Sequence, residues 1–307
     1  MMSADFTLPA RLEDVRSPAR WLARMRDFVA LTRPRVLTLV LFTAPPALVL
    51  GRGAWPSPTT IVGVIVGAAL IGAGCGAINA CSERDADRNM MRTRNRPLPS
   101  GRLTRREALV FGVAVSALGL SALFAVGGWL PALIGAAALA HYILIYTIWL
   151  KPRTAQNIVI GGAAGAASPL IADAAVDGRL GIWGIVLFAI VFLWTPPHFW
   201  AIALYRKREY ESAGFPMLPS VVGNEATRRR MLAYAISLIP ITLIPWLFGE
   251  LSAIYAVTAV TAGCFFIASI GRAIRIRSPN QDRRVFRASI IYLFAVFAEM
   301  LVELALL

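Results

Sequence analysis

Three oxygen-bearing side chains recur at intervals of four residues in the first third of the chain. They are Asn79, Glu83 and Asp87, and at about 100° per residue they fall within roughly 80° of arc on one helix face. Asp85 falls on the opposite side of such a helix. Mg²⁺ takes oxygen ligands and usually holds substrate phosphates as well. The spacing therefore predicts a site in which the two carboxylates and the amide bind one hard cation.

A simpler alternative exists for these acidic side chains. Arg84, Arg88 and Arg92 lie close by in the sequence and could pair with the carboxylates at the edge of a membrane. Ionisable groups at the inner end of a membrane helix are nevertheless a functional hypothesis by default, and spacing alone leaves both interpretations open.

A second polar stretch begins at His198. His198, Tyr205 and Glu209 are separated by seven and four residues, so they are also predicted to share one helix face. Glu209 could supply a further carboxylate to the same metal, and His198 above it could contact the substrate or the metal. The alternative for His198 is a buried histidine with satisfied hydrogen bonds.

A third cluster lies in a short loop between two apolar runs. It contains Lys151 and Arg153, with Tyr146 before them and Asn157 after them. Cations in such a loop can hold phosphate oxygens, or they can serve only as topology anchors. The glycine-rich run after Asn157 lacks the GxxxxGK[ST] pattern of a phosphate loop, and is typical of close helix packing.

The composition indicates that membrane-spanning helices position these residues. Of the 307 residues, 57% are hydrophobic and 16% are charged, against about 25% charged in soluble proteins. Several apolar runs approach the ~20 residues that cross a bilayer, which excludes one large soluble core. The prediction is an all-α integral membrane protein with nine transmembrane helices, at approximately 34–51, 60–82, 107–126, 129–149, 156–174, 181–204, 231–248, 251–271 and 288–306.

The basic residues predict how this bundle lies in the membrane. Crossing the nine segments in turn places all but two of the 31 Lys and Arg residues on one side, the exceptions being Arg52 and Arg179. The positive-inside rule makes that side cytoplasmic, so the N-terminus is cytoplasmic and the C-terminus is outside. The helix ends that carry Asp87 and Glu209 then open on the same side and could frame one cavity.

Two parts of the chain are expected. Residues 1–32 are Arg-rich with scattered apolar positions and are predicted to form a cytoplasmic amphipathic segment on the membrane surface. Residues 33–307 are predicted to form a single membrane domain. The scattered apolar positions are Phe6, Leu8, Trp21, Leu22, Met25 and Phe28.

Other classes of protein fit the sequence less well. The net charge of +14 does not indicate nucleic acid binding, because the basic residues lie between apolar runs. Cys75, Cys81 and Cys264 have no metal spacing and are expected to be reduced, buried thiols. A transporter or channel would place its polar groups near the bilayer midplane, whereas these gather at cytoplasmic helix ends.

The three polar stretches resemble the UbiA superfamily of membrane prenyltransferases, and within it the branch that farnesylates haem. The first motif identifies only the superfamily; the others point to the haem branch, where a histidine replaces the first aspartate of the second acidic motif. One departure is Glu209, because an aspartate is expected before Tyr210. The resemblance runs from about residue 30 to the C-terminus and rests on Asn79-x₃-Glu83-x₃-Asp87 leading into Arg92-Thr93-x₂-Arg96-Pro97-Leu98-Pro99-Ser-Gly-Arg102, on Tyr146-Thr147 through Gly162, and on Pro197-His198-Phe199-Trp200 through Met217-Leu218-Pro219.

This resemblance implies a UbiA-type bundle of nine helices around a lipid-facing cavity, with the active site toward the cytoplasm. It implies Mg²⁺ as cofactor, farnesyl diphosphate as donor, haem b as acceptor, and haem O and diphosphate as products. The expected location is the cell inner membrane, which the chain crosses several times. Haem A synthase is a possible partner protein, and Glu299 and Glu303 in the last helix could face it.

Roles for individual residues follow from the same resemblance. Preorganised charge, rather than a base, is what the departure of diphosphate needs. His198 is expected to position a water molecule or the porphyrin, and His141 to be a packing residue. The expected metal ligands are Asn79, Glu83, Asp87 and Glu209, the expected diphosphate-binding residues are Arg92, Arg96, Lys151, Arg153 and Asn157, and the expected cavity residues are Tyr146 and Tyr205.

The nearest rival is a UbiA-type enzyme that prenylates an aromatic acid such as a hydroxybenzoate or naphthoate. It would share the first motif and the metal. The second and third motifs argue against it, and a substrate assay separates the two.

Overall fold

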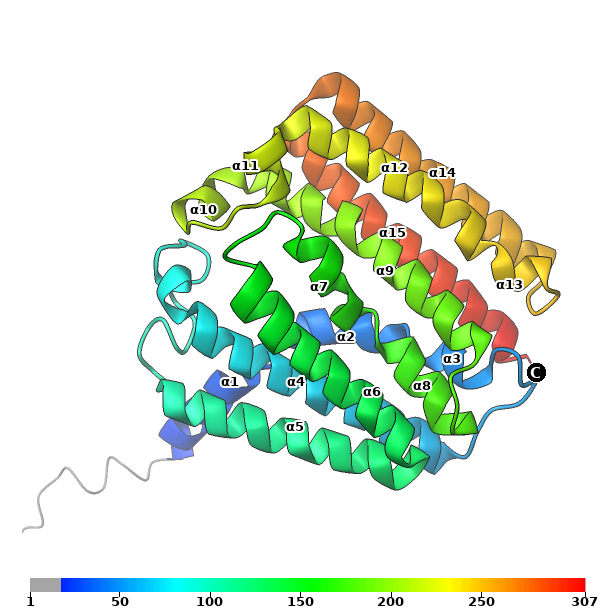
Figure 1. The fold of residues 1–307 in the computed structure, drawn as a ribbon, viewed down its shortest axis with the longest axis horizontal. Coiled ribbons are helices and arrows are strands. Elements are labelled where there is room, and N and C mark those ends of the chain that lie inside the picture. The colour runs from blue at the N-terminus through cyan, green and yellow to red at the C-terminus, as the bar shows by residue number, and fades with distance from the viewer. Residues whose placement is uncertain (1–17, 307) are drawn as a thin grey trace, which may run out of the picture.

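The chain folds into a bundle of helices (Figure 1), and the computed structural model describes residues 18–306. These residues contain no strand, which confirms the all-α prediction. The first half comprises α1 (Pro18–Leu31), α2 (Pro34–Phe42), α3 (Pro45–Val49), α4 (Pro58–Arg88), α5 (Arg105–Gly127), α6 (Trp129–Ala140) and the π-helix η2 (His141–Leu150). The second comprises α7 (Asn157–Gly165), α8 (Ser168–Asp177), α9 (Ile182–Tyr205), α10 (Lys207–Ser212), α11 (Leu218–Val222), α12 (Asn224–Thr242), α13 (Ile244–Leu247), α14 (Ala253–Ile276) and α15 (Pro279–Leu304).

Eight stretches among residues 18–306 are helical, long and apolar enough to cross a membrane. Five are the single helices α4, α5, α9, α14 and α15, and three are the pairs α6–η2, α7–α8 and α12–α13. They coincide with the second to ninth predicted segments. Helix α4 runs past its predicted end at 82 to Arg88, so the acidic ladder continues a membrane helix.

The first predicted segment, 34–51, differs from the structure. It forms two short helices, α2 and α3, separated at Thr43 and Ala44. The cause is the pair Pro45–Pro46, because proline lacks an N–H donor and its ring clashes with the preceding turn. The expectation of one continuous helix here is wrong. Leu48 and Val49 of α3 are nevertheless fully buried, so this segment belongs to the core.

Helices α4 and α5 lie unusually close together, and glycines allow this. A Cβ atom added to Gly119 of α5 would lie 2.7 Å from the carbonyl oxygen of Gly67 on α4. Such contact fixes α4, which carries the acidic ladder, against its neighbour.

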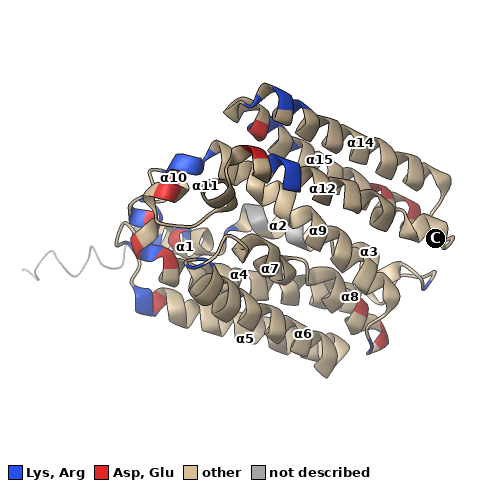
Figure 2. Ribbon diagram, turned by 45° about the horizontal axis from the view of Figure 1, so that its top comes forward, with Lys and Arg blue, Asp and Glu red and all other residues tan. Residues whose placement is uncertain are grey.

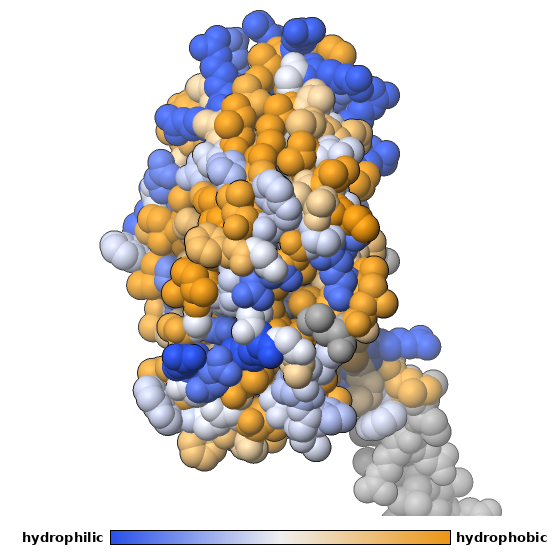
Figure 3. Space-filling view, turned by 90° about the vertical axis from the view of Figure 1, so that its right-hand side faces the viewer, coloured by the Kyte–Doolittle hydropathy of each residue, from blue (hydrophilic) through white to orange (hydrophobic). Residues whose placement is uncertain are grey.

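Hydrophobic side chains also cover much of the outer surface, as a lipid environment requires. Val113 and Phe124 on α5, Leu133 on α6 and Val257 on α14 are all more than half exposed. Figure 3 shows broad hydrophobic areas on one such face. On α1, Trp21 is likewise exposed, whereas the predicted positions Phe6 and Leu8 lie outside the described residues.

Charged residues gather at the end of the bundle where α1, α10 and α11 lie (Figure 2). The opposite end has one compact ionic cluster. There the Arg52 guanidinium donates to Asp177 Oδ1 at 2.9 Å, to Asp173 Oδ1 at 2.8 Å and to the Ala47 carbonyl at 2.8 Å. We call these four residues the Arg52 clamp. It joins the segment after α3 to α8.

The structure shows the contacts of one acidic residue in the last helix, Glu303, whose role the sequence does not indicate. Glu303 of α15 accepts hydrogen bonds from the backbone N–H groups of Ser252 and Tyr255, at 2.7 and 3.1 Å. These groups lie at the start of α14, where N–H groups lack partners within the helix. Glu303 therefore caps α14.

Candidate active site

The acidic ladder on α4 is buried inside the bundle. Asn79, Glu83 and Asp87 are 0%, 8% and 5% exposed, while the Asp85 side chain is 71% exposed and pairs with Arg105. The predicted separation of faces is therefore confirmed. Buried carboxylates need compensating charges, and the structure supplies them from two distant segments and from the loop that follows α4.

Each buried carboxylate has a basic partner. Glu83 pairs with Lys151, from the loop after η2, and with Arg33, from the turn between α1 and α2, at 3.3 Å. Asp87 accepts a hydrogen bond from Arg96 Nη1 at 2.9 Å. These partners differ from the neighbouring arginines of the simpler alternative. Cations thus outnumber anions in this cluster by one.

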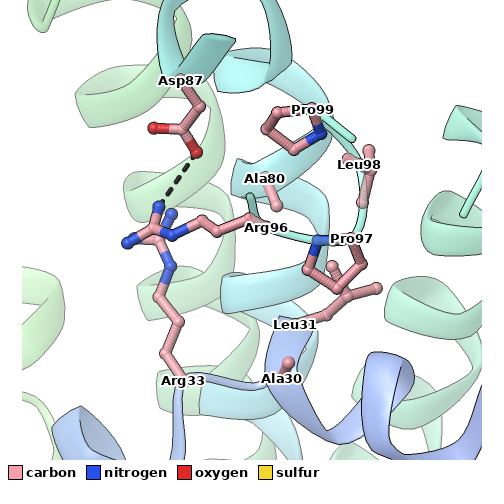
Figure 4. A pocket seen from close by; sticks show the side chains of 9 residues that line it. All are labelled: Ala30, Leu31, Arg33, Ala80, Asp87, Arg96, Pro97, Leu98 and Pro99. Carbon is pink, nitrogen blue, oxygen red and sulfur yellow. Dashed lines mark hydrogen bonds and ion pairs between the residues drawn. The ribbon is translucent and has the colours of Figure 1, made fainter. Parts of the chain in front are cut away.

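The guanidinium groups of Arg33 and Arg96 lie next to one another below Asp87 (Figure 4). Together with Pro97 and Leu98 they line a cavity of about 20 Å³, room for about one water molecule. Burial and the nearby charge of Arg33 lower the pKa of Arg96. Paired like charges are unfavourable unless an anion joins them, so this corner of the site suits phosphate oxygens.

Lys151 is held on three sides. Besides Glu83, its ammonium lies 4.8 Å from the centre of the Phe215 ring and 5.7 Å from that of Tyr146. Phe215 comes from the segment between α10 and α11, so this segment covers the inner end of α4. A Cβ atom on Gly161 would lie 2.2 Å from the Tyr146 ring, which explains one glycine of the run after Asn157.

Two further residues of the third cluster lie differently. Asn157 is fully buried, and its Nδ2 donates to the Thr154 carbonyl at 2.6 Å, while its Oδ1 has no hydrogen-bond partner within residues 18–306. Arg153 is exposed, and its Nη1 donates to the carbonyls of Ile148 and Trp149, each at 2.9 Å. Arg153 therefore caps the end of η2 and is not brought to Glu83.

The second acidic stretch is not one continuous helix. Helix α9 ends at Tyr205, and Glu209 belongs to the separate short helix α10. The prediction that His198, Tyr205 and Glu209 share one helix face is therefore wrong. The chain turns at Arg206, whose guanidinium contacts both Glu209 oxygens at 3.2 Å.

Glu209 still faces the end of the acidic helix. It lines an open cleft of about 370 Å³, so the two polar ends open on the same side, as predicted. Exposed Arg92, one of the predicted diphosphate ligands, lies in the loop on this side. The other lining residues of the cleft are Arg88, Asn89, Met90, Met91, Arg94, Arg208 and Ser212.

His198 lies between α9 and α15, away from Glu209. Its Nδ1 bonds Ser289 Oγ at 2.8 Å, and its ring stacks on Trp194 at 4.2 Å. The Ser289 hydroxyl donates to the Phe286 carbonyl, so His198 Nδ1 must be the donor and Nε2 carries the lone pair. Among the described residues Nε2 has no hydrogen-bond partner. Tyr205 packs against the ring of Phe286, with 6.1 Å between the ring centres.

Residues 40–296 match the model of the UbiA prenyltransferase family. The chain belongs to this family. Proteins named protoheme IX farnesyltransferase are similar along most of its length. That of Erythrobacter litoralis (strain HTCC2594) is 46% identical over 292 residues, which are 94% of this chain and 95% of that protein. That of Symbiobacterium thermophilum is 45% identical over 281 residues, which are 91% of this chain and 94% of that protein.

Solved structures share the fold of this UbiA family member. One, from a study of digeranylgeranylglyceryl phosphate synthase, superposes with a TM-score of 0.77 at 16% identity, covering 93% of this chain and all of that chain. Another is a UbiA homolog from Archaeoglobus fulgidus bound to DMAPP and Mg²⁺, with a TM-score of 0.64 at 20% identity. The match covers 90% of this chain and 99% of that chain.

The donor atoms of the ladder fit a divalent cation that also binds diphosphate. Glu83 and Asp87 provide buried carboxylates, and the Asn79 amide provides one oxygen, which accepts from the Thr147 hydroxyl at 3.0 Å. Nowhere in residues 18–306 do three or more His, Cys, Asp and Glu side chains converge enough to hold a metal alone. A cation bound here would need phosphate oxygens or water to complete its shell, as is usual for Mg²⁺.

Two residues that contribute to the site, Arg33 and Phe215, are not predicted from the sequence motifs. The sequence distinguishes Arg33 only as one of many basic residues on the predicted cytoplasmic side, and Phe215 belongs to no polar motif. Arg33 has a left-handed backbone with φ of +52°, which is costly for a residue with a side chain. In this conformation its guanidinium pairs with Glu83. The Pro34 that follows is the sole local signal of a turn.

Proposed function

We propose that the protein transfers the farnesyl group of farnesyl diphosphate to a vinyl group of haem b, giving haem O and diphosphate. The observation that carries this proposal is the 46% identity, over 94% of the chain, to a protein named protoheme IX farnesyltransferase. The buried ladder and the cations around it supply what departure of a diphosphate needs. No second activity has comparable support.

The first step breaks the bond between C1 of the farnesyl group and the diphosphate oxygen, which keeps the electron pair. Mg²⁺, bound by Asn79, Glu83 and Asp87, would neutralise charge on the leaving group. Lys151 and Arg96 exchange part of their contact with the carboxylates for contact with phosphate oxygens. Because these cations are already in place, little reorganisation opposes the reaction. Glu209 reaches the same end from α10, directly or through water.

The second step joins the haem to the farnesyl cation. The terminal vinyl carbon bonds C1, and the positive charge moves to the carbon next to the porphyrin. Water adds there and loses a proton to solvent, leaving a hydroxyl group. His198 Nε2, which has no hydrogen-bond partner among the described residues, would accept a hydrogen bond from that water.

Mass spectrometry of haem tests the reaction. Purified protein in detergent is incubated with haem b, farnesyl diphosphate and Mg²⁺, and the haem is extracted. We expect a species heavier by one farnesyl group and one hydroxyl group. Release of diphosphate with an aromatic acid, and no modified haem, would instead move the protein to the aromatic branch of the family.

We further propose that α2 and α3 together make a ninth crossing, with the N-terminus cytoplasmic and the C-terminus outside. Supporting this, α1 and the C-terminus lie at opposite ends of the bundle (Figure 1), as an odd number of crossings requires. The basic residues gather at the end where α1 lies (Figure 2). Reporter fusions to each terminus check the orientation. A location in the inner membrane and contact with haem A synthase are proposals of the same kind, to be tested by fractionation and co-purification.

A further inference from the structure

A buried hydroxyl lies behind the acidic ladder and has no role in the proposal above. Thr147 of η2 is 6% exposed. Its Oγ1 lies 3.0 Å from Asn79 Oδ1 and 2.8 Å from the carbonyl oxygen of Tyr142. Both neighbours are acceptors, and a hydroxyl has one hydrogen. Thr147 can therefore donate to only one of them at a time.

The hydrogen bonds of the Asn79 amide are also incomplete in this arrangement. The residue is fully buried, and its Nδ2 faces Glu83 without a hydrogen bond of ordinary geometry. Turning the amide over exchanges its oxygen and nitrogen within nearly the same volume. Nδ2 then donates to Thr147 Oγ1, and the Thr147 hydrogen goes to the Tyr142 carbonyl. Oδ1 now faces Glu83, where a cation shared with that carboxylate, or a hydrogen-bond donor, can satisfy it.

The π-helical winding of η2 makes this geometry possible. Its hydrogen bonds run from residue i+5 to residue i, as from Lys151 N to the Tyr146 carbonyl at 2.8 Å. This corresponds to roughly 80° per residue instead of 100°. Tyr142, Thr147 and Lys151 then fall on one face, within about 50° of arc. An α-helix would spread the same three residues over about half a turn.

We propose that Thr147 is a positioning residue that lets Asn79 reverse its amide. When the site is empty, the hydroxyl donates to Asn79 Oδ1 and the amide nitrogen faces Glu83. When metal and diphosphate are bound, the hydroxyl accepts from Nδ2 and the amide oxygen faces the cation. Only a group that both donates and accepts can support the two states. The inference rests on the proposed metal site on α4.

The test is a binding titration that needs no turnover. Full-length protein in lipid nanodiscs is titrated with Mn²⁺ in the presence of farnesyl thiolodiphosphate, an unreactive donor analogue, and free Mn²⁺ is followed by electron paramagnetic resonance. Thr147→Val should raise the Mn²⁺ dissociation constant roughly 10- to 100-fold, the usual effect of losing an outer-shell partner. Thr147→Ser keeps the hydroxyl and should stay within about threefold of wild type.

Thr195→Val is the matched control. Thr195 is 7% exposed, and its hydroxyl donates to a helix carbonyl, that of Val191, at 2.8 Å, but it contacts no ladder residue. This variant should bind Mn²⁺ as wild type does. If Thr147→Val does not fold, Thr147→Ala replaces it in the same titration. Unchanged affinity without the hydroxyl, or equal weakening in Thr147→Ser, would overturn the proposal.

The two proposals can fail separately. Wild-type protein that makes no modified haem, but binds Mn²⁺ in a Thr147-dependent way, would refute the proposed reaction and leave the positioning role intact. Wild-type protein that makes the product, with Mn²⁺ affinity indifferent to Thr147→Val, would do the reverse.

Discussion

The ammonium group of Lys151 contacts the carboxylate of Glu83, although 68 residues separate them in the chain. Both side chains are largely buried, 12% and 9% exposed. This contact ties the loop after η2 to the acidic ladder on α4. Because Lys151 also lies between two aromatic rings, its position is set before any substrate arrives.

Replacing Lys151 with methionine should weaken donor binding. The variant keeps the length of the side chain but removes the charge that is proposed to contact diphosphate. Hydrogen bonds to charged groups are worth about 1.5–3 kcal/mol, so KM for farnesyl diphosphate should rise roughly tenfold or more, with KM for haem little changed. Steady-state kinetics measure both. Lys207→Met, at a half-exposed pair with Glu211, is the control. An unchanged KM would remove Lys151 from the site.

Asp87→Asn should abolish most turnover in a folded protein. The change removes one ladder carboxylate and leaves its shape, and losing one such electrostatic group typically costs about 100-fold or more in kcat. Asp85→Asn, on the exposed face of the same helix, should be active. Turnover is measured per folded molecule after size-exclusion chromatography. Equal activity of the two variants would show that the ladder holds no metal.

Glu209→Gln tests whether α10 contributes to the same centre. If its carboxylate reaches the metal directly or through water, kcat/KM for the prenyl donor should fall roughly tenfold or more. Glu211→Gln is well matched, because both side chains are partly exposed, 38% and 45%, and each pairs with a basic residue nearby. Similar kinetics for the two variants would confine the metal site to α4.

His198→Phe should lose turnover beyond its effect on stability. The ring keeps its place against Trp194, while Nε2, the predicted water acceptor, disappears. Ser289→Ala breaks the same His198–Ser289 hydrogen bond without touching Nε2, and should cost about 1–3 kcal/mol of stability because it leaves a buried donor unpaired. Thermal unfolding and turnover are compared for both. Normal turnover in both variants would make His198 a structural residue.

Asp282→Asn should destabilise the half of the bundle formed by α12 and α15. Arg228 and Asp282 make two hydrogen bonds, at 2.8 and 2.7 Å, and are 4% and 2% exposed. Breaking a buried pair leaves an uncompensated charge and costs about 3–5 kcal/mol. Glu225→Gln, at the exposed pair with Arg229, should cost less than about 1 kcal/mol. Chemical unfolding in detergent measures the free energy of unfolding of both variants, and an equal loss in the two would contradict the prediction.

Much of this architecture is readable in the sequence because two periodic signals are strong. Apolar runs of bilayer length located eight crossings, and spacing of four residues placed Asn79, Glu83 and Asp87 on one buried face. The effect of a proline pair on a helix is harder to predict. Pro45–Pro46 splits the first segment, whereas Pro196 and Pro197 lie inside α9.

The partners of the ladder could not be read from spacing. Arg33 and Lys151 come from segments far away in the chain, and only the packing of α1 and η2 against α4 brings them to Glu83. The π-helix was equally hidden, since its apolar sequence fits ordinary α-helical winding. The turn at Arg206, which separates Tyr205 from Glu209, has no proline or glycine to announce it.

The Arg52 clamp has a consequence for the membrane itself. A protein that draws a charged diphosphate partway into a bilayer risks opening a path through which ions could follow. The clamp ties α3 to α8 at the far end, and beside it Gly51, with φ of +80°, lets the Trp183 ring lie against the backbone. Separating α3 from α8 would leave the buried Asp173 carboxylate without its basic partner, so this end of the bundle resists opening while polar groups enter at the other end.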